Sequence, residues 1–326
     1  MALLLVLLLL VLLYVAVSLF HDRQRIGYEV IRNVADSARL QSLARSGVDF
    51  GIALLARDAR ESVVDTLHEP WARAGELVAE LAPGEDGQTL DVRITDASGL
   101  IAVNALVPFG EQGRTGYDPR LAAVFSRLLA QEEFGLQPGQ VRDLVAAVID
   151  WLDGDDEEIT EFDGGRGAEG AYYREQHAGG ASRNRPVDSL DQLLGVRGLT
   201  ATLLFGDEDH AGIAPYLSCA AMGDALGRIN INTAPAMVLR ALDERIDRHM
   251  AERLVQYRRE NPHSLADPHW YRAVAGELRL PDELLSSRSR AFVVEAVAGE
   301  AGIESSGRLL LIRGDEGFVF QSWLFE

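Results

Sequence analysis

The sequence predicts an α+β fold in which one long N-terminal helix packs on a small antiparallel sheet, and a large helical block is inserted between two strands of that sheet. Three observations predict it. Residues 1–68 show helical periodicity and contain no proline. Short alternating segments near residue 90 and after residue 291 have the period of strands, and the residues between them are mostly helical in pattern. One sheet that holds both groups of strands is the simplest arrangement, which makes the helical block an insertion.

The predicted long helix has two halves of different character. Met1–Phe20 contains no charged residue, and twenty helical residues span roughly 30 Å, the thickness of a bilayer's hydrocarbon core. From Ile26 onward, apolar residues recur at helical spacing and charged residues fill the other faces. We expect a single helix that continues to about His68 and is roughly 100 Å long, with one half for lipid and one half for a folded domain.

Three interpretations of the apolar segment compete. A secretory signal peptide would have a basic n-region and a shorter apolar run. A plain N-terminal membrane anchor is the second interpretation. The third is a mature pilin-like helix whose basic leader was removed just before Met1. The absence of a basic stretch and the amphipathic continuation favour the third interpretation.

The strand signals lie at both ends of the remaining chain. Leu90–Thr95 alternates apolar and polar residues, Asp96–Gly99 supplies turn residues, and Leu100–Asn104 is expected to be a return strand. These segments predict a hairpin. Three further strands are expected at the C-terminal end, over residues 292–297, 308–312 and 318–323.

Composition narrows the possible functions. The net charge of −19 argues against binding of a phosphate backbone as the main activity, because that affinity comes from Lys and Arg. Acidity suits an extracytoplasmic surface or a protein that binds cations. Cys219 is the one cysteine of the sequence, so no intrachain disulfide can form.

Motifs for catalysis were sought and not found in the sequence. The histidines show no His-Glu-x-x-His spacing, and no serine stands in a nucleophile elbow. The glycine-rich Gly164–Gly167 is not followed by the lysine of a phosphate loop. We therefore expect no enzymatic activity and name no catalytic residue.

The densest chemical signal is a run of acidic residues. Asp150, Asp153, Asp155 and Asp156 fall, with two glutamates, within nine residues. Hard oxygen ligands at this density suit calcium, which takes 6–8 oxygens, better than magnesium, which requires tighter octahedral geometry. The run is no EF-hand, because the glycine and glutamate that such a loop requires are absent from their positions. The other interpretation is a solvated acidic loop, which is what most charge runs are.

Five segments occur in order along the sequence: Met1–Leu8, Ile94–Leu106, Ile149–Asp153, Gly167–Tyr173 and Ile229–Ala234. Together they resemble a known family, the K-type minor pseudopilins of the type II (general) secretion pathway. The resemblance covers nearly the whole chain.

The resemblance implies a place and partners. Most pilin-like subunits carry a glutamate at mature position five; here that position is Leu5, as in K-type subunits, which are placed at the pseudopilus tip. An unpaired carboxylate at membrane depth costs roughly 2.5–3.5 kcal/mol, so a subunit without a partner for it does better with leucine. The implied function is to initiate or cap a pseudopilus that exports folded proteins across the outer membrane. The implied partners are the other minor pseudopilins, the secretion machinery of the inner membrane and, during maturation, prepilin peptidase.

The same resemblance implies processing and calcium. Met1 would be the mature, methylated first residue, on a single helix that crosses the bacterial inner membrane and leaves the soluble part in the periplasm. Calcium sites are implied in the helical block. The positions of this sequence that match are Asp150, Asp153, Asp155, Asp156 and Glu169. Asp150 and Asp153 are three residues apart and so share one face at the end of an apolar helix.

We divide the chain into four parts. Residues 1–22 are the transmembrane part of the long helix, and residues 23–106 are the first part of the pilin-like domain. Residues 107–288 are the inserted block, expected to be all-helical and SAM-like or helix-hairpin-helix-like. Residues 289–326 complete the pilin-like domain with its C-terminal strands.

An alternative function is DNA binding. Ile231–Pro235 and the helical patterns that follow are similar to helix-hairpin-helix modules of DNA-uptake receptors, so a membrane-tethered DNA receptor or a minor pilin for DNA uptake stays open. The link Asp243–Asp247 is acidic and lacks glycine, which would repel a phosphate. Asn230 and Asn232 are instead expected to cap a helix that starts near Thr233.

Overall fold

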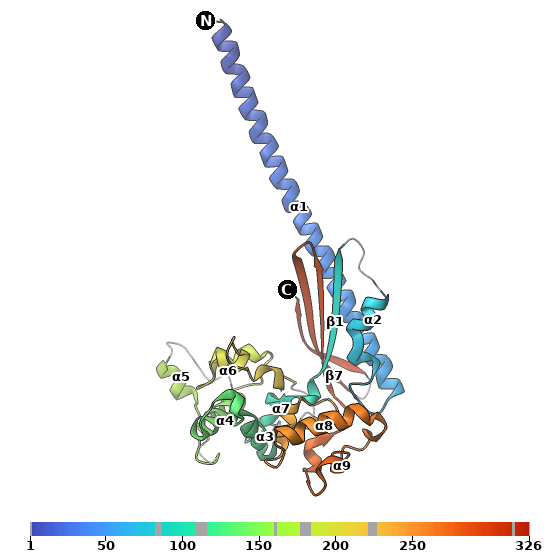
Figure 1. The fold of residues 1–326 in the computed structure, drawn as a ribbon. Helices are drawn as coiled ribbons and strands as arrows, with labels where there is room; N and C mark the ends of the chain where they lie inside the picture. The colour runs from blue at the N-terminus through green and yellow to red at the C-terminus, as the bar shows by residue number, and fades with distance from the viewer. Residues whose placement is uncertain are drawn as a thin grey trace.

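The computed structural model describes residues 2–81, 87–108, 116–159, 162–176, 184–220, 227–314 and 317–325. Its longest element is the helix α1, Ala2–Glu61, whose 60 residues span about 90 Å at 1.5 Å per residue. The first half of α1 extends away from the folded body, and the N-terminus lies at its free end (Figure 1).

The helix ends at Glu61, so the prediction that it continues to about His68 was wrong. The side chain of Ser62 both accepts from the Val64 amide and donates to the Val64 carbonyl oxygen, at 3.1 and 2.6 Å. The Asp65 amide then donates to the carbonyl oxygen of Ser287, at 2.9 Å. These hydrogen bonds satisfy the backbone outside a helix, and the chain turns back toward the sheet.

The second half of α1 packs on a four-stranded antiparallel sheet. The strand order is β1-β6-β7-β8, with β1 at Gln88–Asp96, β6 at Ala291–Glu300, β7 at Ile303–Arg313 and β8 at Phe318–Phe325. The three C-terminal strands are therefore confirmed. Gly51 lets the helix approach closely, because a Cβ there would lie 2.5 Å from Val294 Cγ1. The 3₁₀ helix η1 (Pro70–Arg73) and the helix α2 (Ala74–Leu81) cover the edge of the sheet at β1.

The predicted hairpin was wrong. Strand β1 pairs with β6, in the register Ile94↔Val294, and not with the segment that follows it. Residues 97–99 form a 3₁₀ turn, η2, in which the Asp96 carboxylate accepts from the Ser98 amide at 2.8 Å. The next strand, β2 (Ile101–Ala102), pairs in parallel with β3 (Leu217–Ser218). A distant segment thus takes the hydrogen bonds that a hairpin would have used.

The inserted block lies between β1 and β6, as predicted, and most of its regular elements are helices, although loops make up much of its described part. A second two-residue parallel ladder joins β4 (Ile229–Asn230) and β5 (Leu285–Ser286). Its α-helices are α3 (Pro119–Leu129), α4 (Pro138–Leu152), α5 (Gly170–Gln176), α6 (Ala201–Phe205), α7 (Ala236–Leu242), α8 (Arg248–Glu260) and α9 (Arg272–Ala275). Its 3₁₀ helices are η3 (Val103–Leu106), η4 (Glu132–Phe134), η5 (Leu190–Gly195), η6 (Ala214–Tyr216), η7 (Pro262–Ser264) and η8 (Asp282–Leu284).

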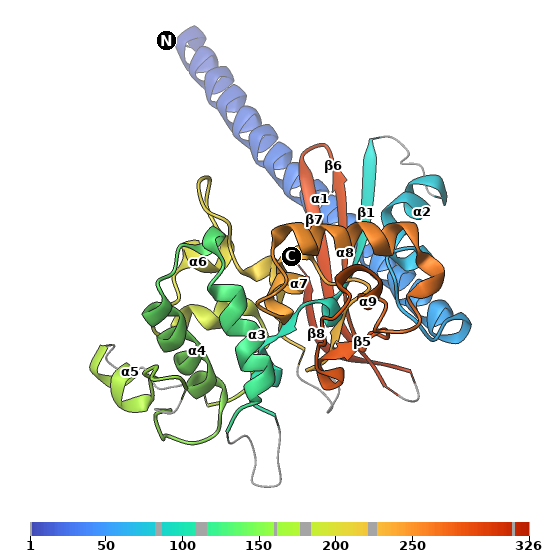
Figure 2. The ribbon, with the colours of Figure 1, turned by 60° about the horizontal axis from the view of Figure 1, so that its bottom comes forward.

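Two separate cores support the two parts. Trp71, Phe292 and Val294 belong to the core between α1 and the sheet. Phe125 and Tyr271 belong to a larger core inside the inserted block. Figure 1 shows the block at the end of the molecule farthest from the N-terminus, beyond the lower end of the sheet, and Figure 2 turns that end toward the viewer.

Candidate metal centre

Two of the predicted acidic residues stand at the end of a buried helix. Helix α4 begins with a capping box, in which Gln137 and Gln140 exchange side-chain and backbone hydrogen bonds, and its apolar residues fill the core of the block. Asp150 lies in its last turn and Asp153 is its C-cap, with 0% and 2% of their surface exposed. Carboxylates this deeply buried are rare unless they have a partner.

A third carboxylate meets them from another segment. Glu169, 5% exposed, directly precedes helix α5. One carboxylate oxygen from each of Asp150, Asp153 and Glu169 lies within 4.8 Å of the other two. A point therefore exists that is at most about 2.8 Å from all three oxygens, which is close to the 2.3–2.6 Å of calcium–oxygen contacts. We call these three residues the insertion cluster.

The aspartate oxygens of this cluster do not all accept hydrogen bonds from the described part of the protein. Asp150 Oδ1 accepts from the Ile159 amide at 3.1 Å, and Glu169 Oε2 accepts from the Gly170 amide at 3.2 Å. Asp150 Oδ2 and Asp153 Oδ1 are buried and have no hydrogen-bond partner among the described residues. A Cβ at Gly167 would lie 1.8 Å from Asp150 Oδ2, so the loop can pass this carboxylate only as glycine. These donors fit a hard cation.

Crowding of the carboxylates changes their acidity. Burial, together with the charges of Asp155, Glu169 and Asp150, raises the pKa of Asp153 to about 8. Burial also raises the pKa of Asp150 to about 6, although hydrogen bonds from the Ile159 and Ala168 amides oppose this. The ionised cluster is therefore costly unless a cation or protons compensate its charge.

The structure does not bring all five predicted residues together. Asp155 is half-buried in the following loop, where it accepts from the Glu157 amide at 2.9 Å. Asp156 is exposed, and its Oδ1 is 3.3 Å from Asn184 Nδ2. Neither belongs to the group of oxygens that lie within 4.8 Å of one another.

Sequence reasoning missed a second carboxylate group, formed by Asp58, Asp65 and Glu69. Its members were assigned to one continuous helix or left unassigned. Thr66 and Glu69 carry the Thr-x-x-Glu spacing that marks a helix start, and Pro70 follows. The Thr66 amide does donate to Glu69 Oε2, at 2.8 Å, so this spacing was a usable signal that the long helix had ended.

Comparison with known proteins shows what the chain resembles. Family models described as "Type II secretion system (T2SS), protein K" match residues 99–205 and 229–275. Type II secretion system protein K of Klebsiella pneumoniae is 30% identical over 233 residues, which is 71% of this chain and 65% of that protein. The protein of the same name from Pseudomonas aeruginosa strain PAO1 is 30% identical over 244 residues, 72% of this chain and 65% of that protein. The chain belongs to the type II secretion system protein K family. Its matched part spans about two thirds of the length of these relatives.

A solved structure agrees with the fold. A chain of the crystal structure of the GspK-GspI-GspJ complex from the enterotoxigenic Escherichia coli type 2 secretion system superposes with a TM-score of 0.66. The match covers 91% of this chain and 99% of that chain at 16% sequence identity. The first protein K match, residues 99–205, contains the whole insertion cluster.

The N-terminal half of α1 in this protein K family member offers a membrane segment. The helix is long and apolar enough to cross a membrane, by length and composition. Its side chains from Leu3 to Phe20 are exposed, and Leu5 is 64% exposed. The processing assignment of Met1 lies outside the described residues.

The segment that resembles a helix-hairpin-helix is used for internal packing. Arg258 is buried on α8, and its Nη1 donates to the carbonyl oxygens of Ile231 and Ala234, at 3.1 and 2.7 Å. The prediction that Asn230 and Asn232 cap the next helix was wrong, because α7 starts at Ala236 and no side chain caps it.

Both asparagines instead point into the protein. Asn230 Nδ2 donates to the Asp65 carbonyl oxygen, Asp96 Oδ2 and Ser289 Oγ, at 2.7–3.0 Å. The Asn232 amide donates to Asn230 Oδ1 at 3.0 Å. Their side chains link the inserted block to the sheet rather than cap a helix.

Proposed function

We propose that this chain is a minor pseudopilin of the type II secretion system and that it occupies the pseudopilus tip. One observation carries the proposal: the apolar half of α1 is exposed, the other half packs on a sheet, and a large block lies at the far end (Figure 1). An exposed apolar helix of this size needs lipid before assembly and other helices after it.

The position of the inserted block favours the tip. Subunits that associate through their N-terminal helices stack along the helix direction. The block lies beyond the sheet, opposite the N-terminus, so it would occupy the space of a subunit added above (Figure 1). Leu5 fits the same role, since an uppermost subunit has no neighbour above to pair a carboxylate at membrane depth.

The partners follow from this proposal. The structural neighbour comes from a GspK-GspI-GspJ complex, which supports other minor pseudopilins as partners of this chain. Prepilin peptidase and the inner-membrane secretion machinery would act during maturation and assembly, with the folded part in the periplasm. The role is structural and non-enzymatic, and the SAM-like, helix-hairpin-helix-like segment serves packing through Arg258 rather than DNA binding.

Calcium would act as a structural cofactor of the inserted block. Asp150, Asp153 and Glu169 would hold it, with Asp155 and Asp156 in the adjacent loop. The ion would neutralise the buried carboxylates and tie the end of α4 to the start of α5.

Position five tests the proposed tip role. We expect Leu5→Glu to reduce both secretion and recovery of the tip complex several-fold, because the new carboxylate costs roughly 2.5–3.5 kcal/mol in the bilayer without a partner. Secretion assays in a host that lacks its own subunit, together with co-purification of the other minor pseudopilins, measure the effect. Leu5→Val is the matched control, and the amount of protein in the membrane fraction identifies failed insertion. Unchanged secretion and recovery in Leu5→Glu would contradict the special role of this position.

A further inference from the structure

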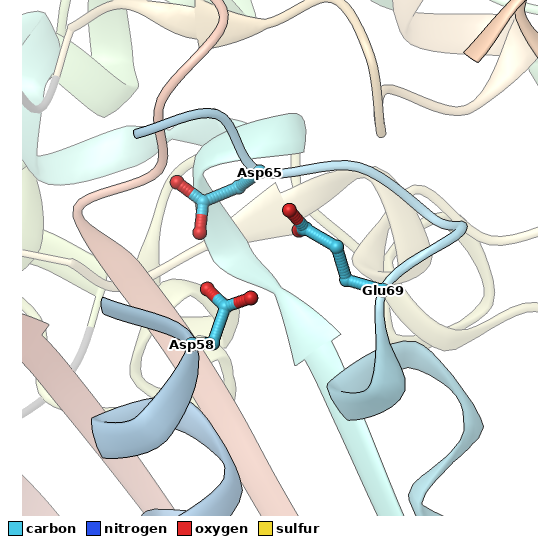
Figure 3. A group of neighbouring side chains, drawn as sticks. All are labelled: Asp58, Asp65 and Glu69. Carbon is cyan, nitrogen blue, oxygen red and sulfur yellow. The ribbon is translucent and has the colours of Figure 1, made fainter. Parts of the chain in front are cut away.

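A second carboxylate group lies where α1, the sheet and the inserted block meet. Asp58 is in the last turn of α1, Asp65 is in the loop that follows, and Glu69 immediately precedes η1. Figure 3 shows the three carboxylates pointing toward one another. One oxygen from each lies within 4.8 Å of the other two. We call these three residues the junction cluster.

Asp65 is the best-buried member and has an unused oxygen. Its exposed fraction is 1%, and Oδ2 accepts from the Ser289 amide at 2.7 Å and from Arg313 Nη1 at 2.8 Å. Its other oxygen, Oδ1, is buried without a hydrogen-bond partner in the described part of the chain. A buried carboxylate oxygen that accepts no hydrogen bond is costly, which calls for a missing ligand at this point.

The charges of the cluster are only partly balanced. Arg313 Nη2 also lies 3.4 Å from Asp58 Oδ2, so one guanidinium serves two carboxylates. Glu69 Oε2 accepts from two neutral donors, the Thr66 amide at 2.8 Å and Trp71 Nε1 at 2.9 Å. Three carboxylates therefore face one guanidinium in a largely buried place, which leaves an excess of negative charge.

We propose that the junction cluster binds a divalent cation, and that this cation is calcium. The donors are hard carboxylate oxygens, which calcium and magnesium both prefer. The three carboxylates come from separate segments and share their site with a guanidinium, and such an irregular set suits calcium, which accepts flexible geometry, better than magnesium, which requires a near-ideal octahedron. Asp65 Oδ1 is the oxygen left open for the ion, and the ion's charge offsets the excess that Arg313 leaves.

The cation would stabilise the joint between the two parts of the molecule. The Asp65 carbonyl oxygen accepts from Asn230 Nδ2 and Asn232 Nδ2 of the inserted block, at 3.0 and 3.3 Å. The Asp65 amide donates to the carbonyl oxygen of Ser287, which directly follows β5, and Asp65 Oδ2 accepts from the Ser289 amide, two residues before β6. An ion on the Asp65 carboxylate holds this loop in place and, through it, the block against the sheet. The site lies outside residues 99–205 and 229–275, and the inference is independent of the proposed secretion function.

Calcium binding to the full chain in detergent tests the inference. The double variant Asp153→Asn/Glu169→Gln first removes the insertion cluster. Isothermal titration should then still detect one bound calcium. Adding Glu69→Gln should weaken that binding at least about tenfold, a loss of roughly 1.4 kcal/mol. Glutamine keeps an oxygen that can accept from Thr66 and Trp71, so the local fold is preserved. The matched control is Glu61→Gln, which removes an exposed charge one turn from Asp58 and should leave binding unchanged.

A second measurement tests the inference in case the double variant does not fold. In the otherwise unmodified chain, equilibrium dialysis should show one calcium fewer for Glu69→Gln than for Glu61→Gln. Terbium in place of calcium should also give emission sensitised by Trp71, since its ring nitrogen is 2.9 Å from Glu69 Oε2. The inference is overturned if the folded double variant binds no calcium, or if Glu69→Gln and Glu61→Gln bind equally.

Discussion

The insertion cluster and the junction cluster use the same donors in different electrostatic settings. Each gathers three carboxylates whose oxygens lie within 4.8 Å of one another, and each contains nearly inaccessible aspartates. The junction cluster has Arg313 at 2.8 Å from Asp65. In the insertion cluster, Asp150 Oδ1 accepts from the Ile159 amide at 3.1 Å, and the charge of Arg197 also acts on Asp150.

This difference teaches how much each cluster depends on a cation. An arginine compensates charge permanently, so the junction can hold together in the absence of metal. In the insertion cluster, two aspartate oxygens, Asp150 Oδ2 and Asp153 Oδ1, are buried without a hydrogen-bond partner among the described residues, so we expect these aspartates to bind calcium more tightly than the junction cluster does. The junction cluster is an ion pair to which a cation adds stability, and the insertion cluster is a site that depends on a cation for its stability.

Removing Arg313 should give the largest effect. Its guanidinium is 6% exposed, pairs with Asp58 and Asp65, and lies 5.0 Å from the Phe292 ring centroid. Arg313→Met should lower the free energy of unfolding by about 3–5 kcal/mol, because it leaves buried carboxylates without their partner. Denaturant titration in chelator measures this loss.

Calcium should partly restore the stability that Arg313→Met loses. In this variant the junction cluster, like the insertion cluster, would depend on a cation. With Arg313 gone, the junction cluster should bind calcium more tightly than in the unmodified chain, since its negative charge is larger. Arg308→Met on the same strand is the control: this side chain is 60% exposed and pairs with Glu295 at 3.3 Å, so the change should be below about 1 kcal/mol. A stability loss of similar size in both variants would refute the special role of Arg313.

Chelation should have the next largest effect, mainly through the insertion cluster. At a free calcium concentration of about 100 times Kd, binding to the folded state alone adds about 2.7 kcal/mol. For a chain of 326 residues, at about 2.1 cal/mol/K of unfolding entropy per residue, that corresponds to roughly 4 °C in melting temperature. Calorimetry with calcium and with chelator measures the shift, and Asp153→Asn/Glu169→Gln should remove most of it.

A neutral change in the same loop is the control for calcium. Glu157→Gln removes an exposed charge outside the cluster and should keep the full calcium shift. If chelator does not change the melting temperature of the unmodified chain, the proposal that calcium binds the insertion cluster is wrong. Equal losses in Glu157→Gln and in the double variant would instead indicate a diffuse acidic surface without a defined site.

Local patterns predicted the elements that each cluster rests on, but not the junction itself. The end of α4 was predictable because Asp150 and Asp153 follow an apolar helical run at a spacing of three. The junction depends on Arg313, which is 248 residues from Asp65 in the sequence. A pattern read over a short stretch of sequence cannot reveal a contact between residues so far apart. Asp58 and Asp65 therefore looked like ordinary polar residues of the predicted long helix.

The wrong hairpin has the same physical cause. Asp96–Gly99 has turn residues, and Ile101–Ala102 has strand composition, but the partner of that strand is Leu217–Ser218. Strand propensity indicates that a segment forms a strand, but it does not identify the partner strand. The three C-terminal strands were predicted because their partners are neighbours in sequence, joined by tight connections.

Asp96 extends the comparison to a buried acid with neutral donors. Its carboxylate accepts from the Ser98 amide at 2.8 Å, Asn230 Nδ2 at 3.0 Å, and the hydroxyls of Thr233 and Ser289. Burial, helped by the charge of Asp65 and opposed by the Ser289 and Thr233 hydroxyls, raises the pKa of Asp96 to about 6. Between about pH 4 and pH 6 the folded chain therefore holds a proton that the unfolded chain has lost.

The stabilisation from that proton should disappear as the pH rises through about 6, because the folded state then also loses it. Asp96→Asn cannot titrate, so the difference in unfolding free energy between the unmodified chain and this variant should change steadily over that interval. Denaturant titrations at half-unit steps in chelator measure it, with Asp91→Asn, exposed on the same strand, as the control. Calcium at the junction cluster should move the change to lower pH, because a nearby cation favours the ionised carboxylate. A difference that is flat with pH would show that the hydroxyl donors, rather than burial, determine the charge state of Asp96.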